Sequence, residues 1–547
     1  MRAVQSSAKS PSPNPFRRGL PWLFGAIAFI YLYFIPYFQV LNNPNENARV
    51  YQIRAAVELH KLSVNEQIAR YGMVNDLARV GSRLYSGKAP GMVMYGIPVY
   101  AALSAFEKAR GAESVTPFRL LYTLRFFCVL LPVLFFLIAF RRFLYRFTHS
   151  RSLADILTIV LATGTMLLPY SLLFVNHSLT AASAFGTLIA AEAYAEHGPR
   201  KAWKRGAYLF FAGFLLAFCT AADHALFPVS CLLFFYCVGR AGPALRPMAA
   251  LCAGALIPTV ATAVYNQICW GHPFKTSIGF LANPEFAKNH SQGLFGLVGP
   301  SAISTYNILI SPAKGLFFFS PIFLLALAAL LFACIRSPFR RIRRIAILSC
   351  AITIWMICFA CSLINWDAGW TVGPRYATVI VPFGLFGIAL AWKSLSDRAK
   401  RVLIPLGIVL SLISMVFTVS SSVLFPHLPP DSQNPVFELI WPLWRDGYVP
   451  HTLLEPLFLL KGRAAQLPFL MVFGFVLLQV LAKGISLLSL HSRAALSLTR
   501  KAAIGAALCA LSGLFIYLAS LPRTPNSQAL KAHVNWIENT VWEPKRQ

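Results

Sequence analysis

Hydrophobic residues form long runs along this chain, and short polar connections separate them. Thirteen runs approach or exceed the ~20 residues that a helix needs to cross ~30 Å of hydrocarbon. They cover residues 20–41, 119–140, 152–174, 177–196, 206–222, 224–240, 246–266, 314–335, 344–365, 372–392, 401–424, 466–488 and 500–521. The pattern predicts an all-α polytopic membrane protein with about thirteen transmembrane helices. A shorter apolar stretch, 93–107, predicts an interfacial or re-entrant helix.

The charges of the connections predict which side each one occupies. Four short connections are rich in arginine and lysine: 141–151, 197–206, 336–344 and 393–401. Basic connections stay in the cytoplasm, and all four do so if a single crossing separates residue 41 from residue 141. This topology places the N-terminus inside. The C-terminus and the long polar connections, 42–118, 267–313, 364–374 and 425–465, then lie on the outer face.

Composition agrees with this assignment. The 547 residues are 57% hydrophobic and only 12% charged, which excludes an ordinary soluble domain. The formal net charge is +30, but the basic residues cluster in the short connections. The charge therefore reflects topology and contact with anionic lipid headgroups, and we expect no nucleic-acid partner. The eleven cysteines lie mostly in apolar runs without paired spacing, so we expect neither a disulfide framework nor a zinc site.

The first outer connection begins with a predicted helix, "NNPNENARVYQIRAAVELHKL". Asn43 before Pro44 is a helix-start signal. Apolar residues from Val50 to Val57 recur at helical spacing, which predicts an amphipathic helix on the membrane surface. Glu46 lies in its first turn, beside the end of the first span. A purely structural role for Glu46 would be to complement the helix dipole, worth ~0.3–1 kcal/mol.

The same connection ends in "NDLARVGSRLYSGKAPG", where acidic and basic residues crowd together. Lys88 is followed by Pro90 and Gly91, which end any preceding helix and restrict the chain. A lysine held on a rigid turn at the lipid boundary can bind phosphate as a point charge. The bland alternative is a lysine whose stem lies along apolar surface while its ammonium reaches water. Asp76 lies nearby in the sequence.

Other polar residues gather at the outer ends of the predicted spans. Any one of them costs little near an interface and proves little alone. Their shared side is the informative feature, because a site needs acids, bases and amides on one face. These residues are Asn176, His177, Asp223, His224, Tyr265, Asn266, Lys314, Trp366, Asp367 and Arg375.

Five segments together resemble the bacterial branch of the GT-C membrane glycosyltransferases. They are "PNENARVYQIRAAVE", "YSGKAPGMVMYGIPVY", "YNQICWGHPF", "SPAKGLFFFSPIFLLAL" and "WDAGWTVGPRY". The relatives are the protein O-mannosyltransferases and the transferase that adds aminoarabinose to lipid A. The resemblance extends to about residue 395. It implies a GT-C-like catalytic region, 20–395, that follows a cytoplasmic segment, 1–19. A C-terminal transmembrane region, 396–521, and an outer tail, 522–547, complete the chain.

The resemblance also implies roles for individual residues. The family has an acid just after the first span, in a pattern like Asp-Glu-x-Arg, and "ENAR" aligns Glu46 with it. In the other register Asn45 takes that place, leaving Glu46 as the second acid. The family's phosphate-binding Lys-Pro-Pro segment corresponds to "KAP", and so to Lys88.

The expected chemistry is an inverting transfer of a sugar from a polyprenyl-phosphate donor. The acceptor is a lipid, a glycan or a protein at the outer face of the bacterial inner membrane. Catalytic roles fall to Glu46 and Asp76. Lys88, Arg49, Lys314 and Arg375 bind the donor phosphate, and the remaining outer residues bind substrate. No metal cluster is visible, so no cofactor is expected, although other GT-C enzymes use a divalent cation.

Two rival classes compete with this interpretation. A lipid or oligosaccharide transporter would have charged or broken segments at mid-membrane and repeated halves. Here the polar residues lie at span ends, and no repeat is visible. A ligase of lipid-linked oligosaccharide works at the same face on a diphosphate carrier. It typically needs several arginines in one outer loop, and the connection 42–118 has six.

The topology can be tested by cysteine labelling in a background without the native cysteines. An impermeant reagent added from outside should modify cysteines placed at Ser114 and Gln433. It should leave cysteines at Ser152 and Ser394 unmodified, because those connections are cytoplasmic. Labelling of position 114 only from the cytoplasm would overturn the thirteen-span topology.

Overall fold

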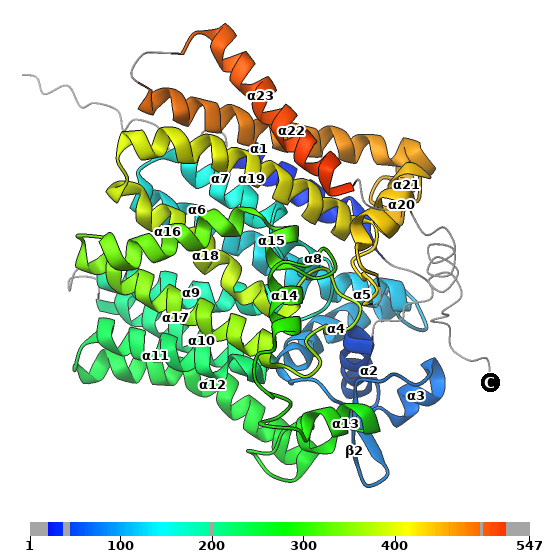
Figure 1. Ribbon diagram of the computed structural model, residues 1–547. Coiled ribbons are helices and arrows are strands. Elements are labelled where there is room, and N and C mark those ends of the chain that lie inside the picture. Colours follow the sequence, from blue (N-terminus) through cyan, green and yellow to red (C-terminus); the bar gives the residue numbers. More distant parts are fainter. Residues whose placement is uncertain are drawn as a thin grey trace, which may run out of the picture.

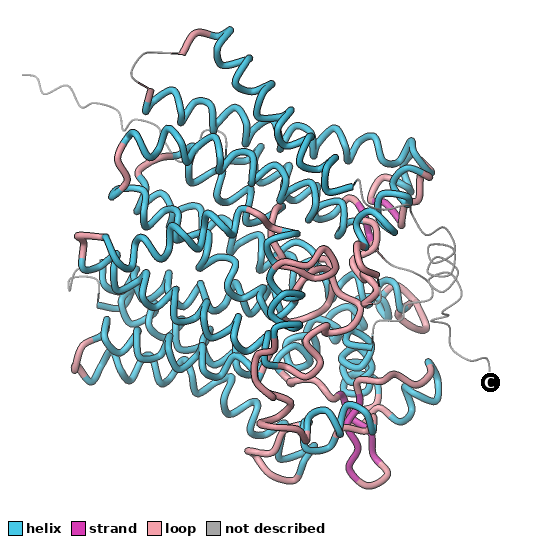
Figure 2. The backbone as a smooth tube through the Cα atoms, in the orientation of Figure 1, coloured by secondary structure: helices cyan, strands magenta, loops and turns pink. Residues whose placement is uncertain are grey.

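The computed structural model describes residues 20–36, 44–196, 202–430, 432–458, 460–492 and 496–520. The predicted cytoplasmic segment 1–19 and the predicted outer tail 522–547 lie outside these residues. The described chain is almost entirely helical, with two short two-stranded sheets. Long helices run side by side as a bundle, and shorter elements and loops gather at one end (Figures 1 and 2).

The bundle contains a helix for each of the thirteen predicted spans. Its helices are α1 (Leu20–Leu32), α5 (Pro117–Arg125) continuing through η1 (Phe126–Leu130) into α6 (Leu131–Thr148), α7 (Arg151–Thr163) with α8 (Leu167–Ser171), α9 (His177–Glu196), α10 (Ala202–Ala222), η3 (His224–Leu226) with α11 (Phe227–Ala241), α12 (Leu245–Trp270), α16 (Ile322–Arg336), α17 (Arg340–Ser362), η5 (Arg375–Ile380) with α18 (Val381–Ala391) and η6 (Trp392–Ser394), α19 (Asp397–Val423), α22 (Gly462–His491) and α23 (Leu498–Ser520). Within the described residues, nine helices are long and apolar enough to cross a membrane, and two shorter apolar helices accompany them. The chain is therefore an all-α, multi-pass membrane protein, as the sequence predicts.

Most of the remaining elements lie in the predicted outer connections, whereas β1 (Phe34–Ile35) and α15 (Leu316–Phe319) lie inside the predicted spans 20–41 and 314–335. The remaining elements are β1, α2 (Pro44–Glu58), α3 (Asn65–Tyr71), β2 (Leu77–Val80), β3 (Arg83–Ser86), α4 (Gly91–Ala109), η4 (Ser277–Phe280), α13 (Pro284–His290), α14 (Ala302–Leu309), α15, η7 (Val436–Ile440), α20 (Trp441–Arg445), β4 (His451–Thr452) and α21 (Glu455–Phe458). Strand β1 pairs antiparallel with β4, and β2 pairs antiparallel with β3. We call this end of the bundle the site end. The opposite end, which holds the connections α6–α7, α16–α17 and α18–α19, is the basic end (Figure 1, left).

Helix α2 begins at Pro44, as predicted, but its environment differs from the predicted membrane surface. Its polar face is not exposed on a membrane surface, because Glu46, Arg49, Gln52 and Arg54 are all at most 2% exposed. The hairpin β2–β3 and helix α4 pack against α2. Since a buried charge needs a partner, the polar residues of α2 must be paired inside the protein. Helix α4 is also longer than the predicted stretch 93–107.

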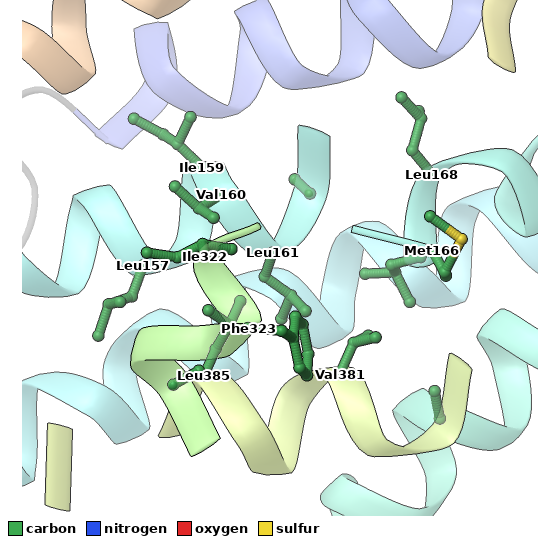
Figure 3. Packing of buried hydrophobic residues seen from close by; sticks show 14 of the residues in the cluster. Leu157, Ile159, Val160, Leu161, Met166, Leu168, Ile322, Phe323, Val381 and Leu385 are labelled. Carbon is green, nitrogen blue, oxygen red and sulfur yellow. The ribbon is translucent and has the colours of Figure 1, made fainter. Parts of the chain in front are cut away.

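The helices of the bundle contact one another in two ways. Large apolar side chains fill the space between α7, α16, α18 and α19, as Figure 3 shows for residues such as Leu161, Phe323 and Val381. Helices α10 and α12 instead touch backbone to backbone. A Cβ atom at Gly213 would lie 1.9 Å from the Leu251 carbonyl oxygen, and one at Gly254 would lie 1.8 Å from that of Phe210. Small residues permit this close approach, which is common in membrane bundles.

Candidate functional site

Glu46, in the first turn of α2, forms a buried ion pair with Arg125. The Arg125 Nε and Nη2 donate to the two carboxylate oxygens at 2.9 and 2.8 Å, and the Phe174 backbone N–H also donates to Glu46. Glu46 is 0% exposed and Arg125 is 5% exposed. Burial alone would raise the pKa of Glu46, but the Arg125 guanidinium outweighs it and holds that pKa below the usual value. Both carboxylate oxygens are engaged, so this geometry gives Glu46 an anchoring role.

Arg49 lies one turn after Glu46 on α2 and reaches the connection between α8 and α9. Its guanidinium donates to Asn45 and, at 2.9 Å, to the Asn176 side-chain oxygen. The Asn176 amide in turn donates to Asp223 at 2.8 Å. Arg49 is 2% exposed, and its Nε has no hydrogen-bond partner within the described chain. Burial lowers the pKa of Arg49 to about 10, which leaves it charged at neutral pH.

Lys88 lies on the turn between β3 and α4, and close backbone contacts hold this turn in place. A Cβ at Gly91 would lie 2.6 Å from the Ala222 backbone nitrogen, so the start of α4 touches the end of α10. The Gly87 N–H donates to the Asp76 carbonyl at 2.8 Å. The turn that the sequence predicts therefore lies beside Asp223, which follows α10.

The Lys88 ammonium is 2.8 Å from the Asp76 carboxylate, and the two side chains are 23% and 14% exposed. Burial lowers the pKa of Lys88, and the nearby Asp76 opposes that shift. Lys88 is also within electrostatic range of Arg49 and Arg375. Three cations from α2, the β3–α4 turn and η5 thus lie close together, with Asp76 and Asp223 as their acidic neighbours.

Arg375 and His177 complete this cluster. Arg375 stacks over the Tyr376 ring at 4.9 Å and donates to the Tyr376 hydroxyl at 2.9 Å. His177 begins α9, between the rings of Tyr170 and Tyr376, and its Nδ1 is 4.0 Å from Asp223. The Arg375 Nε and the His177 Nε2 are buried and lack a hydrogen-bond partner among the residues described. The unpaired buried Nε–H groups of Arg49 and Arg375, close to the Lys88 ammonium, favour an anionic ligand.

Lys314 lies near the cluster but has its own partners. Its ammonium donates to the Gly369 carbonyl at 2.5 Å, the Thr371 carbonyl at 3.2 Å and the Thr371 hydroxyl at 2.8 Å. Burial lowers the pKa of Lys314 to about 7. An ammonium has three hydrogens to donate, and all three are engaged. In this arrangement Lys314 holds the connection 363–374 in place, and phosphate binding by Lys314 stays a prediction.

Other predicted substrate-binding residues lie outside the cluster. Tyr265 donates to Gln52 at 2.7 Å, and the Asn266 amide donates to the Pro273 carbonyl at 3.0 Å. The His224 Nδ1 contacts the Thr220 carbonyl at 3.1 Å. Trp366 packs near Tyr376, and Asp367 is within electrostatic range of Lys314.

Sequence reasoning missed Arg125, Tyr170, Tyr376 and His427. Arg125 lies within the apolar run 119–140, and an arginine there implies a buried partner. That signal was available, whereas the tyrosines look like ordinary span-end aromatics. His427 lies near Glu46, and burial lowers its pKa to about 4. Within the described ranges, no three His, Cys, Asp or Glu side chains form a group that could hold a metal ion. The metal-free reaction stays an expectation.

Comparison with known proteins gives distant structural similarities. No family model matches the sequence, and no curated protein matches it. The apo oligosaccharyltransferase of Archaeoglobus fulgidus is 12% identical, with a TM-score of 0.43, over 76% of this chain and 57% of that one. Arabinosyltransferase EmbB from Mycobacterium smegmatis is 13% identical, with a TM-score of 0.43, over 98% of this chain and 44% of that one. This chain therefore spans about half the length of each protein, and likeness at this level establishes neither family nor activity.

The Glu46–Arg125 pair leads to a stability prediction. Glu46→Gln should destabilise the protein by ~3–5 kcal/mol, because Arg125 would remain buried without its counter-charge. This differs from a base on an exposed helix, where glutamine would leave the fold intact. Arg125→Met should cost a similar amount.

The double variant Glu46→Gln, Arg125→Met should recover part of the loss, since no unpaired charge remains. Thermal unfolding of the four proteins in one detergent measures these differences. Lys61→Gln is the control, because Lys61 pairs with Glu66 at the exposed surface. Additive losses in the double variant would show that the two side chains are not coupled.

Proposed function

We propose that this protein is a membrane glycosyltransferase that takes its sugar from a polyprenyl-phosphate donor at the site end of the bundle. One observation carries the proposal: Arg49, Lys88 and Arg375 come together from three distant segments, and among the described residues the buried Nε atoms of Arg49 and Arg375 have no hydrogen-bond partner. The phosphodiester of a sugar-linked polyprenyl phosphate supplies the negative charge and the acceptor oxygens that such a cluster lacks. The GT-C-like segments named above support a lipid-linked sugar as the bearer of that phosphate.

The location of the cluster supports a reaction at a membrane surface. Lys88 lies in the connection 42–118, and Arg375 begins η5 directly after the connection 364–374. Loops gather at this end of the bundle (Figure 2). This arrangement disfavours a transporter, whose binding site lies near mid-membrane. Orientation of the site end toward the outside follows from the basic connections at the opposite end.

The proposed reaction is one displacement with inversion at the sugar. An acceptor hydroxyl attacks the anomeric carbon, and the bond from that carbon to the phosphate oxygen breaks. The leaving polyprenyl phosphate keeps the electron pair, and Lys88, Arg49 and Arg375 stabilise its added charge. A carboxylate takes the acceptor proton as general base. No covalent sugar–enzyme intermediate is needed.

Asp223 is the carboxylate that we assign to the proton. It follows α10, is 20% exposed, and accepts hydrogen bonds from Asn176 and from the Ala225 N–H at 3.1 Å. Asp76 is paired with Lys88 and is expected to position that lysine. Glu46 is sealed by Arg125 and cannot reach an acceptor in this conformation.

Lys88→Ala tests the phosphate cluster. It should weaken use of the donor more than use of the acceptor, by ~2–4 kcal/mol, the scale for one preorganised charge stabiliser. Lys88→Arg should restore function poorly, because a planar guanidinium cannot replace a point charge on this turn. The measurement is donor-dependent kinetics in nanodiscs with a panel of polyprenyl-phosphate hexoses and pentoses. Lys61→Ala, on an exposed part of the same connection, is the control. Parental kinetics and stability in Lys88→Ala would remove Lys88 from the site.

Asp223→Asn tests the general base. The substitution keeps the shape and the hydrogen bond to Asn176 but cannot accept the proton. Turnover should fall by ~10²–10⁴-fold while donor binding stays close to that of the parent. Asp76→Asn should instead weaken donor binding, because it releases Lys88. Near-normal turnover in Asp223→Asn would transfer the role to Asp76 or Asp367.

A further inference from the structure

An apolar cavity lies inside the bundle, in the half nearer the basic end. Its volume is about 70 Å³, and its walls come from α7, α16, α18, α19 and α22. Leu153 at the start of α7 and Leu487 near the end of α22 place it close to the basic connections. The cation cluster lies at the other end of these helices, and the proposed transfer makes no use of the cavity.

The cavity is suited to hydrocarbon. Its lining is almost wholly aliphatic, with Leu157 and Ile322 facing each other from α7 and α16 (Figure 3). The lining hydroxyl of Ser411 donates to the Gly407 carbonyl at 2.6 Å, so it is already paired. Apolar cavities of this kind exclude water and accept apolar ligands, and about 10–15 Å³ is enough for one water. A cavity of about 70 Å³ therefore has room for several methylene groups.

A tryptophan and several charged side chains border the cavity. Trp392 lines it, and the Lys400 ammonium lies 5.0 Å above the Trp392 ring. Asp397 is 3.7 Å from Lys400 and 2.9 Å from the His491 Nδ1. Tryptophan beside a cation is typical of the level at which lipid headgroups meet the protein. The adjoining connection adds Lys393, Arg398 and Arg401, so the border is positively charged overall.

We propose that the cavity binds one hydrocarbon chain of an anionic phospholipid whose phosphate faces Lys400. The apolar walls match the chain, and the positive border matches the headgroup. A zwitterionic lipid would fit the walls but gain less at the border. The bound lipid would fill space between five helices that side chains leave open, and an unfilled void is destabilising. It is a structural lipid of the leaflet at the basic end, separate from the donor at the site end.

Neighbouring alanines on α16 give a matched pair of variants. Ala329 lines the cavity, whereas the adjacent Ala328 is exposed on the lipid-facing surface. Ala329→Phe should fill the cavity and displace the chain, and Ala328→Phe adds the same ring outside it. The full-length protein is extracted in mild detergent from bilayers of equal phosphatidylglycerol and phosphatidylcholine. Native mass spectrometry then counts retained phospholipids.

The parent and Ala328→Phe should retain one phosphatidylglycerol, and Ala329→Phe should lose it at least fivefold. Lys400→Gln should reduce the preference for phosphatidylglycerol over phosphatidylcholine. Lys61→Gln, at the exposed surface of the connection 42–118, should change it little. Equal retention in the two phenylalanine variants, or no lipid preference in the parent, would overturn the proposal.

A second measurement applies even if Ala329→Phe fails to fold. The fluorescence of Trp392 is the difference between the parent and Trp392→Phe. Phosphatidylglycerol brominated on its chain should quench this fluorescence, and brominated phosphatidylcholine should quench it less. Absence of that difference would also refute the site. Neither measurement requires glycosyl transfer, so either can fail without bearing on the proposed function.

Discussion

The Glu46–Arg125 ion pair determines how the outer elements join the bundle. Both Glu46 and Arg125 are buried, so removing either one would leave the other as a costly unpaired charge. Phe174 adds a backbone N–H to Glu46, and Asn176, two residues later, accepts from Arg49 one turn further along α2. Helix α2 is therefore attached to a single connection at two points. These two contacts fix the rotation of α2 about its own axis, and Arg49 points into the cluster.

The buried charged groups near the two ends of the bundle have different surroundings. Near the basic end, Glu192 is fully buried and receives Arg240, Arg341 and the Tyr236 hydroxyl, which joins α9, α11 and α17. Such an acid has its partners and holds helices together. At the site end, Arg49, Arg375 and His177 keep buried nitrogen atoms without partners in the described structure. A cluster that is incomplete without an anion is the more plausible place for a ligand.

The two ends of the bundle thus serve different purposes, and the bilayer explains why. Polar groups are costly in hydrocarbon, so they concentrate at the ends of helices or pair within the core. The site end combines long connections with converging charges. The basic end combines short connections with an excess of positive charge, which suits anionic lipid headgroups. A donor at one end and a structural lipid at the other are compatible with this division.

The sequence alone determined the membrane class and the helices, because apolar runs of bilayer length have few other folds available. Among the described residues each of the thirteen runs contains a helix, and the Lys88 turn was visible from its proline and glycines. The sequence could not reveal that Arg125 pairs with Glu46, since 79 residues separate the two. It also could not tell that Lys314 is fully engaged while Arg375 is not. Those differences depend on which side chains meet after the helices pack, and only the tertiary structure decided them.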